Sequence, residues 1–469
     1  MLTILKKWIL IFAFITGASL PCMAKPPLPS TGKGIGVNFL RMHEVVKNVR
    51  GRKMPLDAEV IFQNISRYDA VWQSQLIVWH SHPGWNLIRR RTPEKLMLRS
   101  MSSLSTLPRT SFEYVFDYDY INTYHPEWFL LQDTKNPLKA DPRNPDNRIR
   151  WVPNDKTSFF YDRFYIDVSN EDFQDWAAQR ILNFVSGKAN EFDYNSRKGM
   201  NLDYPYDGIA FDNVVLRRIK ARFNKSYPNW KYADDIAGWK EAYLRYLRKV
   251  HKALAKHGYI LVVNFSFYWE LERNDSDLYD LMDTVDGIIH EWAVGYGKDA
   301  TGAPDRHWGG EKWSRCIKRH EAIINKGLID WWFCYPTEEP ELGKKQFLYT
   351  YCSFLLIKRP GYSLFYASSD KGWGRNLKVP WYDEYDLQIG EPTSARYLRN
   401  GCWLRNYKNA KIVVNPTEVR RKVLIDKNKL WLDWTSKKAV HELTLAAKSG
   451  RILLPTPYKT KSKIPDSGK

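Results

Sequence analysis

Several features that would place a protein in a familiar class are missing from this sequence. Beyond its first residues, no apolar run reaches the roughly 18 uninterrupted residues that a membrane-spanning helix needs. The chain has neither the Gly-x-Ser-x-Gly elbow of serine hydrolases nor the His-Glu-x-x-His pair of zinc proteases. A glycine-rich stretch at 32–36 precedes an apolar run instead of following one, so it lacks the strand–loop–helix context of a phosphate-binding loop. These absences argue against an integral membrane protein, a nucleotide-binding fold and these two hydrolase classes.

The start of the chain has the pattern of a secretory signal peptide. Two lysines precede an apolar run at 8–15, and small residues then precede Lys25. We therefore expect residues 1–24 to be removed and the product to be exported to the periplasm or the extracellular space. Pro21 stands directly before Cys22, where a lipoprotein would carry a small residue, so anchoring at Cys22 is not expected.

Cysteines are few, and acidic residues are fewer than basic ones. Four cysteines follow the predicted signal peptide, and their spacing matches no metal site, while disulfides among them are left open: Cys316, Cys334, Cys352 and Cys402. Lysine and arginine total 72 against 52 aspartates and glutamates, a formal net charge of +20. For an exported protein this balance suggests either an acidic polysaccharide or anionic envelope as partner, or a basic surface that keeps the protein soluble. Nucleic acid is not expected as a partner.

Short apolar runs alternate with stretches of helical period over most of the chain. Strands that are almost wholly apolar, separated by amphipathic helices, indicate a parallel sheet covered on both faces. Eight such runs favour a closed barrel, so residues 25–385 are predicted to form an α/β fold, a (β/α)8 TIM barrel. A further run at 34–40 is interpreted as an extra N-terminal strand. The eight runs are 68–73, 96–101, 164–168, 207–212, 259–265, 286–292, 329–335 and 362–367.

The pattern changes after about residue 385. Turn signals such as Asn400-Gly401 and Asn415-Pro416 now separate short strands. Residues 386–456 are therefore predicted to form a small C-terminal antiparallel β domain resembling a β-sandwich. Residues 457–469 have almost nothing to bury and are predicted to be a disordered tail.

Two strands of the predicted barrel repeat one pattern, an Asp-Gly pair followed after three residues by a second acid. Asp207 and Asp212 delimit the first strand, and Asp286 and Glu291 the second. Because barrel active sites form at the carboxyl ends of the strands, Asp212 and Glu291 are the catalytic candidates. Asp207 and Asp286 begin their strands and are interpreted as structural.

By this count Asp212 ends the fourth strand and Glu291 the sixth, so the two strand ends lie about 10 Å apart and two inward side chains can flank one sugar bond. Glycoside hydrolysis needs such a pair, one acid to attack the anomeric carbon and one to protonate the leaving oxygen. We assign Asp212 as nucleophile and Glu291 as general acid/base. The alternative is that both acids end their strands by pairing with arginine or lysine.

Other residues at the same end of the predicted barrel are candidates for substrate binding. Asp167, Asn264 and Tyr335 end the predicted third, fifth and seventh strands, where each could bind a sugar hydroxyl or cap the next helix. Trp292 and Trp373 fall near strand ends, and their faces suit the apolar side of a sugar ring. No metal or cofactor is expected.

Three stretches together resemble the hypothetical glycosyl hydrolase family 15 group of bacterial glycosidases. They are "FYIDVSNEDFQDW" at 164–176, "YDGIAFDN" at 206–213 and "GCWLRNYKNAKIVVNPT" at 401–417, within a resemblance that spans about 60–455. More distantly, the chain is similar to polygalactosaminidase-type barrels and to retaining α-galactosidases. The resemblance implies a (β/α)8 barrel, a polysaccharide substrate and no obligatory cofactor. By position, the more distant similarity implies Asp212 as nucleophile and Glu291 as proton donor.

The chain departs from that family in its basic balance and in a wide loop at 136–156, which we expect to cover the cleft as a lid or subsite wall. The favoured hypothesis is an exported glycosidase that cleaves an exopolysaccharide or envelope glycan, with an anionic glycan among the substrates considered. The competing hypothesis is a non-hydrolytic carbohydrate-binding barrel that assists polysaccharide assembly or export. The sugar, its linkage, endo or exo action, the choice between retention and inversion, and the oligomeric state are left open.

Overall fold

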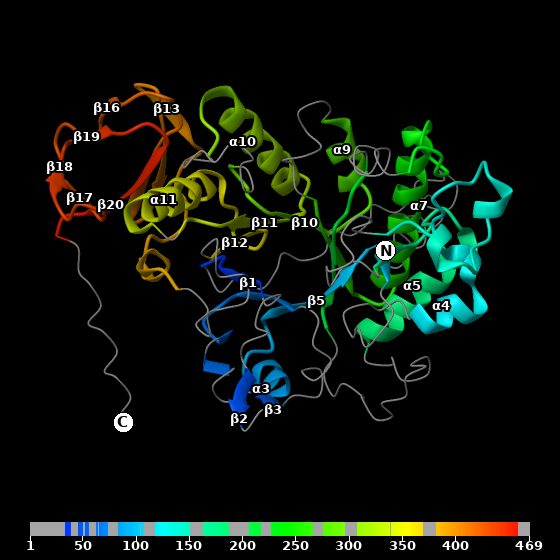
Figure 1. The fold of residues 1–469 in the computed structure, drawn as a ribbon. Helices are drawn as coiled ribbons and strands as arrows, with labels where there is room; N and C mark the ends of the chain where they lie inside the picture. Colours follow the sequence, from blue (N-terminus) through cyan, green and yellow to red (C-terminus); the bar gives the residue numbers. More distant parts are fainter. Residues whose placement is uncertain are drawn as a thin grey trace, which may run out of the picture.

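The protein is described by a computed structural model with a parallel barrel at its centre (Figure 1). Eight strands pair in the order β1 (Gly36–Asn38), β4 (Ala70–Gln73), β5 (Leu96–Ser102), β8 (Gly208–Asp212), β9 (Ile260–Asn264), β10 (Gly287–His290), β11 (Ile329–Cys334) and β12 (Ser363–Ala367). The structure describes residues 33–38, 46–49, 52–55, 62–63, 65–73, 83–103, 105–106, 118–150, 163–186, 206–216, 227–265, 275–295, 307–337, 339–368 and 381–457. The predicted (β/α)8 barrel is confirmed.

The first and last strands close the barrel. Ile35 forms a parallel bridge with Phe365, whose N–H donates to the carbonyl of Gly34 over 2.8 Å. The interior is filled by side chains: a Cβ added to Gly36 would lie 2.3 Å from Cζ2 of Trp331. Closure removes the sheet edges, and the packed interior leaves chemistry to the strand ends.

The identity of two strands differs from the prediction. The run at 164–168 was wrongly assigned to the barrel, because β7 (Phe164–Tyr165) pairs antiparallel with β6 (Ser105–Thr106) in a separate two-stranded sheet. The run at 34–40, interpreted as an extra strand, supplies β1 of the barrel instead. Both runs are short and apolar, and only pairing distinguishes them. The two errors cancel, so β8 and β10 remain the fourth and sixth strands.

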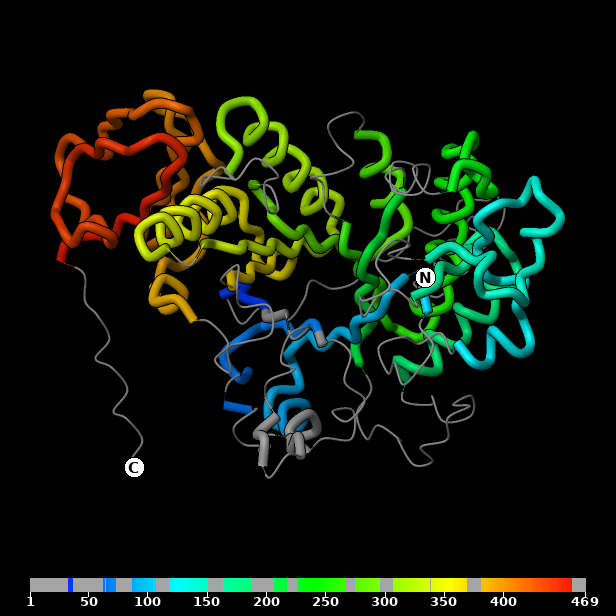
Figure 2. Tube along the Cα trace, in the orientation of Figure 1, coloured from blue at the N-terminus to red at the C-terminus, as the bar shows by residue number. Residues whose placement is uncertain are grey.

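Helices cover the barrel, and the chain between β5 and β8 carries an insertion. The covering helices are α3 (Pro83–Arg91), α5 (Glu171–Val185), α7 (Ile236–Ala255), α9 (Ser276–Met282), α10 (Gly310–Asn325) and α11 (Pro340–Ile357). The insertion contains α4 (Tyr118–Tyr124) and the short turns η3 (Pro126–Trp128), η4 (Pro137–Lys139) and η5 (Pro145–Asn147). It lies across the barrel from the C-terminal strands (Figure 2). A separate hairpin joins β2 (Val46–Val49) to β3 (Arg52–Pro55).

The C-terminal strands form a compact antiparallel unit. They are β13 (Tyr397–Arg399), β14 (Cys402–Tyr407), β15 (Ala410–Asn415), β16 (Arg421–Leu424), β17 (Trp431–Asp433), β18 (Ala439–Val440), β19 (Glu442–Leu445) and β20 (Ser449–Pro455). Six make one sheet in the order β13-β14-β15-β20-β17-β18, and β16 pairs with β19. Leu404, Val423 and Leu443 belong to a small core of their own. On α11, Cys352 approaches so closely that a Cβ on Gly450 of β20 would lie 2.6 Å from it.

Two further expectations meet the structure here. Within the described part of the chain, no helix is both long and apolar enough to cross a membrane. The four cysteines left open for pairing are buried free thiols: Cys316, Cys334, Cys352 and Cys402. The predicted signal peptide, the tail from residue 458 and Trp373 lie outside the described residues.

Candidate active site

Asp212 is the last residue of β8 and lies half-buried at the carboxyl end of the barrel. Its carboxylate accepts three hydrogen bonds, each from an N–H group. The backbone N–H of Asn213 donates to Oδ1 and its side-chain amide to Oδ2, both over 2.8 Å, and the amide of Asn264 donates to Oδ1 over 2.8 Å. Asn213 has a left-handed backbone with φ of 60°, which asparagine tolerates better than most residues. The carboxylate is therefore held in one orientation at the end of its strand.

Asn264 lies between the two candidate carboxylates. It is the last residue of β9, the strand between β8 and β10, and it is 6% exposed. Its partner in register on β10 is Ile289, two residues before Glu291. Because its amide is directed at Asp212, Asn264 orients that carboxylate, and substrate binding by Asn264 stays a prediction.

Glu291 directly follows β10 and is half-buried. The hydroxyl of Tyr335, the residue after β11, donates to Oε1 of Glu291 over 3.2 Å. The ring of Trp292 packs against that of Tyr335 with centroids 4.8 Å apart. The φ of Trp292 is 60°, which for a bulky side chain costs on the order of 1–3 kcal/mol and requires the surrounding contacts to hold it.

The two carboxylates therefore occupy the same end of the barrel on strands separated by β9 alone. Strand spacing places their backbones about 10 Å apart. Their partners differ in chemistry, since an N–H group can only donate, whereas the hydroxyl of Tyr335 can donate to a carboxylate or accept from a carboxylic acid. All three contacts on Asp212 thus come from N–H donors, whereas the hydroxyl of Tyr335 can bond Glu291 in either protonation state.

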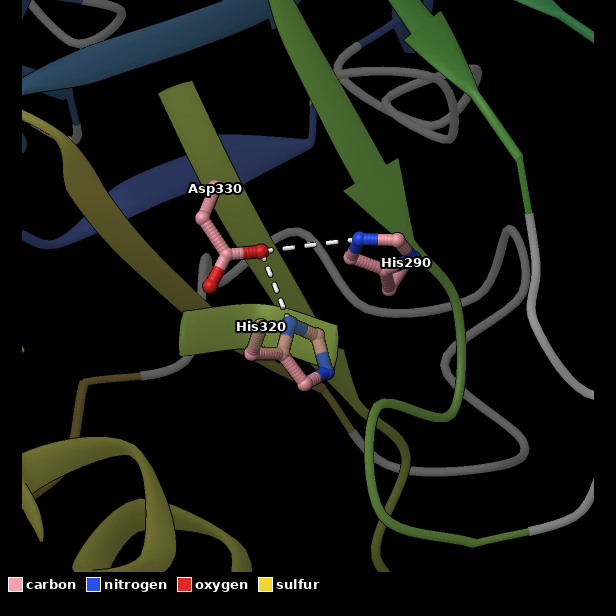
Figure 3. Close-up of side chains that lie close together, drawn as sticks. All are labelled: His290, His320 and Asp330. Atoms are coloured by element: carbon pink, nitrogen blue, oxygen red, sulfur yellow. Dashed lines mark hydrogen bonds and ion pairs between the residues drawn. The ribbon is translucent and has the colours of Figure 1, made fainter. Parts of the chain in front are cut away.

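His290, which directly precedes Glu291, belongs to a cluster of three ionisable side chains (Figure 3). His290 of β10, His320 of α10 and Asp330 of β11 are 0%, 0% and 1% exposed. Asp330 Oδ1 lies 2.8 Å from His320 Nδ1 and 3.5 Å from His290 Nε2. The indole N–H of Trp332 donates to the other oxygen of Asp330 over 2.6 Å. This cluster was not predicted, although a charged residue within an otherwise apolar strand, such as Asp330 of β11, is a signal for buried pairing.

The two histidines of the cluster differ in charge. Burial, with the charged His320 beside it, holds the pKa of His290 well below its usual value. Burial alone would lower the pKa of His320 too, but the carboxylate of Asp330 and the neighbouring Cys316 outweigh it and raise that pKa to about 10. The cluster therefore holds a neutral His290 beside a buried ion pair.

These three side chains have the types and proximity of a metal-binding set, with donor atoms within 4.8 Å of one another. Their hydrogen bonds do not fit one. His320 Nδ1 faces a carboxylate oxygen, and His320 Nε2 lies 3.4 Å from the carbonyl oxygen of Ala293. Both of these oxygens accept, so both ring nitrogens of His320 carry protons, and a histidine that donates from both nitrogens has no lone pair for a metal ion.

The acids at the amino ends of the strands have the structural roles that were predicted for them. Asp207 accepts the backbone N–H of Met97 on the neighbouring β5 over 2.7 Å, and its Oδ2 lies 2.9 Å from Arg89. Asp286 accepts the N–H of Leu261 on the neighbouring β9 over 2.8 Å. These carboxylates join adjacent strands and lie at the opposite end from Asp212 and Glu291.

Asp167 does not end a barrel strand, because the run that contains it lies outside the barrel sheet. Its carboxylate accepts the N–H and hydroxyl of Ser169 over 3.0 and 2.6 Å, and Lys231 Nζ lies 2.9 Å away. These contacts organise the turn before α5, whose N-cap is Asn170. A substrate contact by Asp167 stays a prediction.

Part of the loop at 136–156, expected over the cleft, is described as far as residue 150. Most of 137–146 is exposed, but residues 147–150 are buried. The Arg148 guanidinium lies 3.8 Å from the ring centroid of Phe129 and donates to Asn122 over 2.7 Å, so this end of the loop packs into the insertion. Just before this loop, Asp133 forms a bridge with Asn229, which precedes α7. The role of the loop as a lid stays a prediction.

Comparison with known proteins places the chain in context. The profile of hypothetical glycosyl hydrolase family 15 matches residues 113–411. Solved structures similar to this one include a point mutant of the trehalulose synthase MutB with Tris, at TM-score 0.49 and 10% identity, covering 90% of this chain and 99% of that one. MutB from Pseudomonas mesoacidophila MX-45 gives TM-score 0.47 at 10% identity, covering 90% and 98%. No curated protein sequence matches the chain.

Proposed function

The chain belongs to hypothetical glycosyl hydrolase family 15, and from this premise we propose that it is an exported glycoside hydrolase that cleaves a polysaccharide with retention of configuration. Asp212 is the nucleophile and Glu291 the general acid/base. The observation that carries the assignment is a difference between contacts: three N–H groups donate to Asp212, and the contacts of Glu291 include the hydroxyl of Tyr335.

The proposed reaction has two displacements. Asp212 attacks the anomeric carbon while Glu291 gives its proton to the departing glycosidic oxygen, so a glycosyl ester forms and the first sugar bond breaks. Glu291, now a carboxylate, takes a proton from water, and the resulting nucleophile displaces Asp212. Tyr335 can follow Glu291 through both steps, because its hydroxyl donates to the carboxylate and accepts from the acid.

The substrate is proposed to be an exopolysaccharide or envelope glycan. Trp292 lies beside Glu291, is partly exposed and offers aromatic surface to a sugar ring, while the buried ring of Tyr335 packs against it. Trp373 is proposed to add to this surface. The net charge of +20 supports an anionic glycan, because a basic protein attracts and retains such a polymer. Export is supported by the signal pattern of the first 24 residues.

The assignment is tested by a matched pair of substitutions on one strand. Asp212→Asn should lower the release of reducing ends from bacterial exopolysaccharides by at least about 10⁴-fold, because the nucleophile is lost. Asp207→Asn, the same change at the other end of β8, should leave turnover within about twofold. Full activity in Asp212→Asn would refute the nucleophile. Binding of the glycan without reducing-end release, equal in wild type and variant, would instead establish the carbohydrate-binding barrel.

Retention of the anomeric configuration is tested by a separate measurement. Proton NMR of the first product formed from a cleaved substrate should show the anomeric configuration of the starting glycoside. Inverted product would leave the two carboxylates in place as catalysts, but it would make Asp212 a base that activates water.

A further inference from the structure

The cluster behind the site lies directly against the turn that carries Glu291. Trp331 lies inside the barrel against Gly36, so by strand alternation its neighbours Asp330 and Trp332 point outward, toward the helices. His290 pairs in register with Trp332 and shares that outward face. Here they meet the side chains of Cys316 and His320 from α10, and we call His290, Cys316, His320 and Asp330 the anchor network.

The anchor network contacts the turn at its third residue. The thiol of Cys316 donates to the carbonyl oxygen of Ala293, and His320 Nε2 lies 3.4 Å from the same oxygen. The N–H of Ala293 in turn donates to the carbonyl of Phe333 on β11 over 3.1 Å. Both backbone groups of Ala293, two residues after Glu291, are therefore held by the layer behind the site.

The anchor network also reaches the neighbouring strand. His290 Nδ1 lies 3.0 Å from the carbonyl oxygen of Phe265. A carbonyl only accepts, so this nitrogen donates. Phe265 follows Asn264, whose amide holds Asp212. One buried cluster is thus linked to the backbone beside Glu291 and to the backbone beside the residue that orients Asp212.

The charge within the anchor network is confined to one pair. His320 donates toward Asp330 and toward Ala293, while Asp330 also accepts from Trp332. Arg319 of α10 pairs with Asp275, with Nε 2.8 Å from the carboxylate, and its charge helps to lower the pKa of His290. A buried ion pair whose partners are bound to backbone and indole groups fixes geometry, because breaking any contact leaves a charge without water or partner.

We propose that the anchor network is a positioning device that sets Glu291 relative to Asp212 by holding the 291–295 turn and the end of β9. This rests on the proposed function for its catalytic meaning, but the mechanical part is independent of it. No member of the network touches the reacting atoms; each acts through Ala293 or Phe265.

The kinetic test compares two buried aspartates that each pair with a cation in the helical layer. Asp330→Asn should lower kcat 10- to 100-fold with KM within about twofold, because a small displacement of a catalytic group is sufficient for such a loss. Asp277→Asn is the control: its carboxylate is 0% exposed and pairs with Lys240 at 2.6 Å, so this ion pair joins α9 to α7 and not α10 to β11. Equal kinetic loss in both variants would reduce the network to a stabilising role.

A second readout needs no substrate. Hydrogen–deuterium exchange in a peptide covering 291–295 should be at least tenfold faster in Asp330→Asn than in wild type, and unchanged in Asp277→Asn. If the wild type proves not to be a glycosidase, this measurement still decides the mechanical part. Unchanged exchange in Asp330→Asn would overturn the proposal whatever the activity.

Two further experiments cover a variant that does not fold and a bound metal ion. Should Asp330→Asn fail to fold, Cys316→Ala removes one bond to Ala293 and leaves the ion pair; it should still speed exchange at 291–295 and lower kcat about threefold. Elemental analysis of the purified wild type should find no stoichiometric metal ion. One zinc ion per chain, lost in Asp330→Asn, would overturn the proposal by making the cluster a metal centre.

Discussion

The two ends of the barrel use the same residue type in opposite ways. At the amino ends, Asp69, Asp207 and Asp286 each precede a strand and accept a backbone N–H at the neighbouring strand. The donors are Ile35, which directly precedes β1, Met97 of β5 and Leu261 of β9. At the carboxyl ends, Asp212 and Glu291 accept largely from side chains. A carboxylate bound to strand backbone is part of the architecture. One bound to side chains can exchange a partner for a substrate.

The glycine of each Asp-Gly pair belongs to the architectural end. A Cβ on Gly208 would lie 2.1 Å from the carbonyl oxygen of Ile260, and one on Gly287 would lie 2.6 Å from Cβ of Ile329. The repeat seen in the sequence therefore has two causes. Its first half closes the barrel tightly, and its second half supplies the candidate catalytic acids.

After the loss expected for Asp212→Asn, the largest effect that separates the two ends is expected at Glu291. Glu291→Gln should lower turnover of substrates with poor leaving groups by about 10²- to 10⁴-fold, because the leaving oxygen departs without a proton. An activated aryl glycoside of an accepted sugar should be affected much less in its first step, and azide should restore turnover. Asp286→Asn, at the other end of the same strand, is the control. Similar losses for both substrate types would contradict the role of acid.

A smaller effect, on stability alone, is expected at the amino end. Asp207→Ala removes the acceptor of the buried Met97 N–H, so the free energy of unfolding should fall by about 1–3 kcal/mol. Denaturant titration measures the change, and kcat/KM should stay within about twofold. A large fall in kcat/KM at unchanged stability would show that Asp207 is not purely structural, contrary to the roles assigned to the two ends.

The smallest expected effect is the pH dependence of the free energy of unfolding, which has opposite signs at the two ends. The pKa of His320 is raised from 6.5 to about 10, so the native state holds its proton longer and stability falls as pH rises from 6.5 to 10. At the amino end, burial lowers the pKa of Lys358 to about 8. The native state therefore releases this proton before the unfolded state does, and stability rises as pH rises from 8 to 10.5. Of these two groups, only His320 acts between pH 6.5 and 8.

In that window the free energy of unfolding should fall by at most about 1.4 kcal/mol per pH unit. Asp330→Asn should flatten the slope, because His320 loses the carboxylate that holds its proton. Chemical denaturation at half-unit steps checks both. A slope that is identical in wild type and Asp330→Asn would show that this ion pair does not form.

The sequence predicts what depends on local periodicity. Alternation within "YDGIAFDN" separates Asp207 from Asp212, and the count of apolar runs finds the barrel. Pairing is not local, so the short runs of β1 and β7 were exchanged. The anchor network was missed for the same reason, because His290, His320 and Asp330 come from three elements that only the fold brings together. His320, on the buried side of α10, was the available signal.

Helix α11 is covered on both sides, by the barrel strands β11 and β12 and by the C-terminal sheet at β20, so thirteen of its eighteen residues are buried. Neither half of the molecule can keep this helix covered without the other. Heat or denaturant should consequently disassemble barrel and C-terminal strands as one cooperative unit, and a recombination event that separated them would leave an apolar helix face open to aggregation. The C-terminal strands are therefore part of the folding unit of the enzyme and not an independent domain that could be removed.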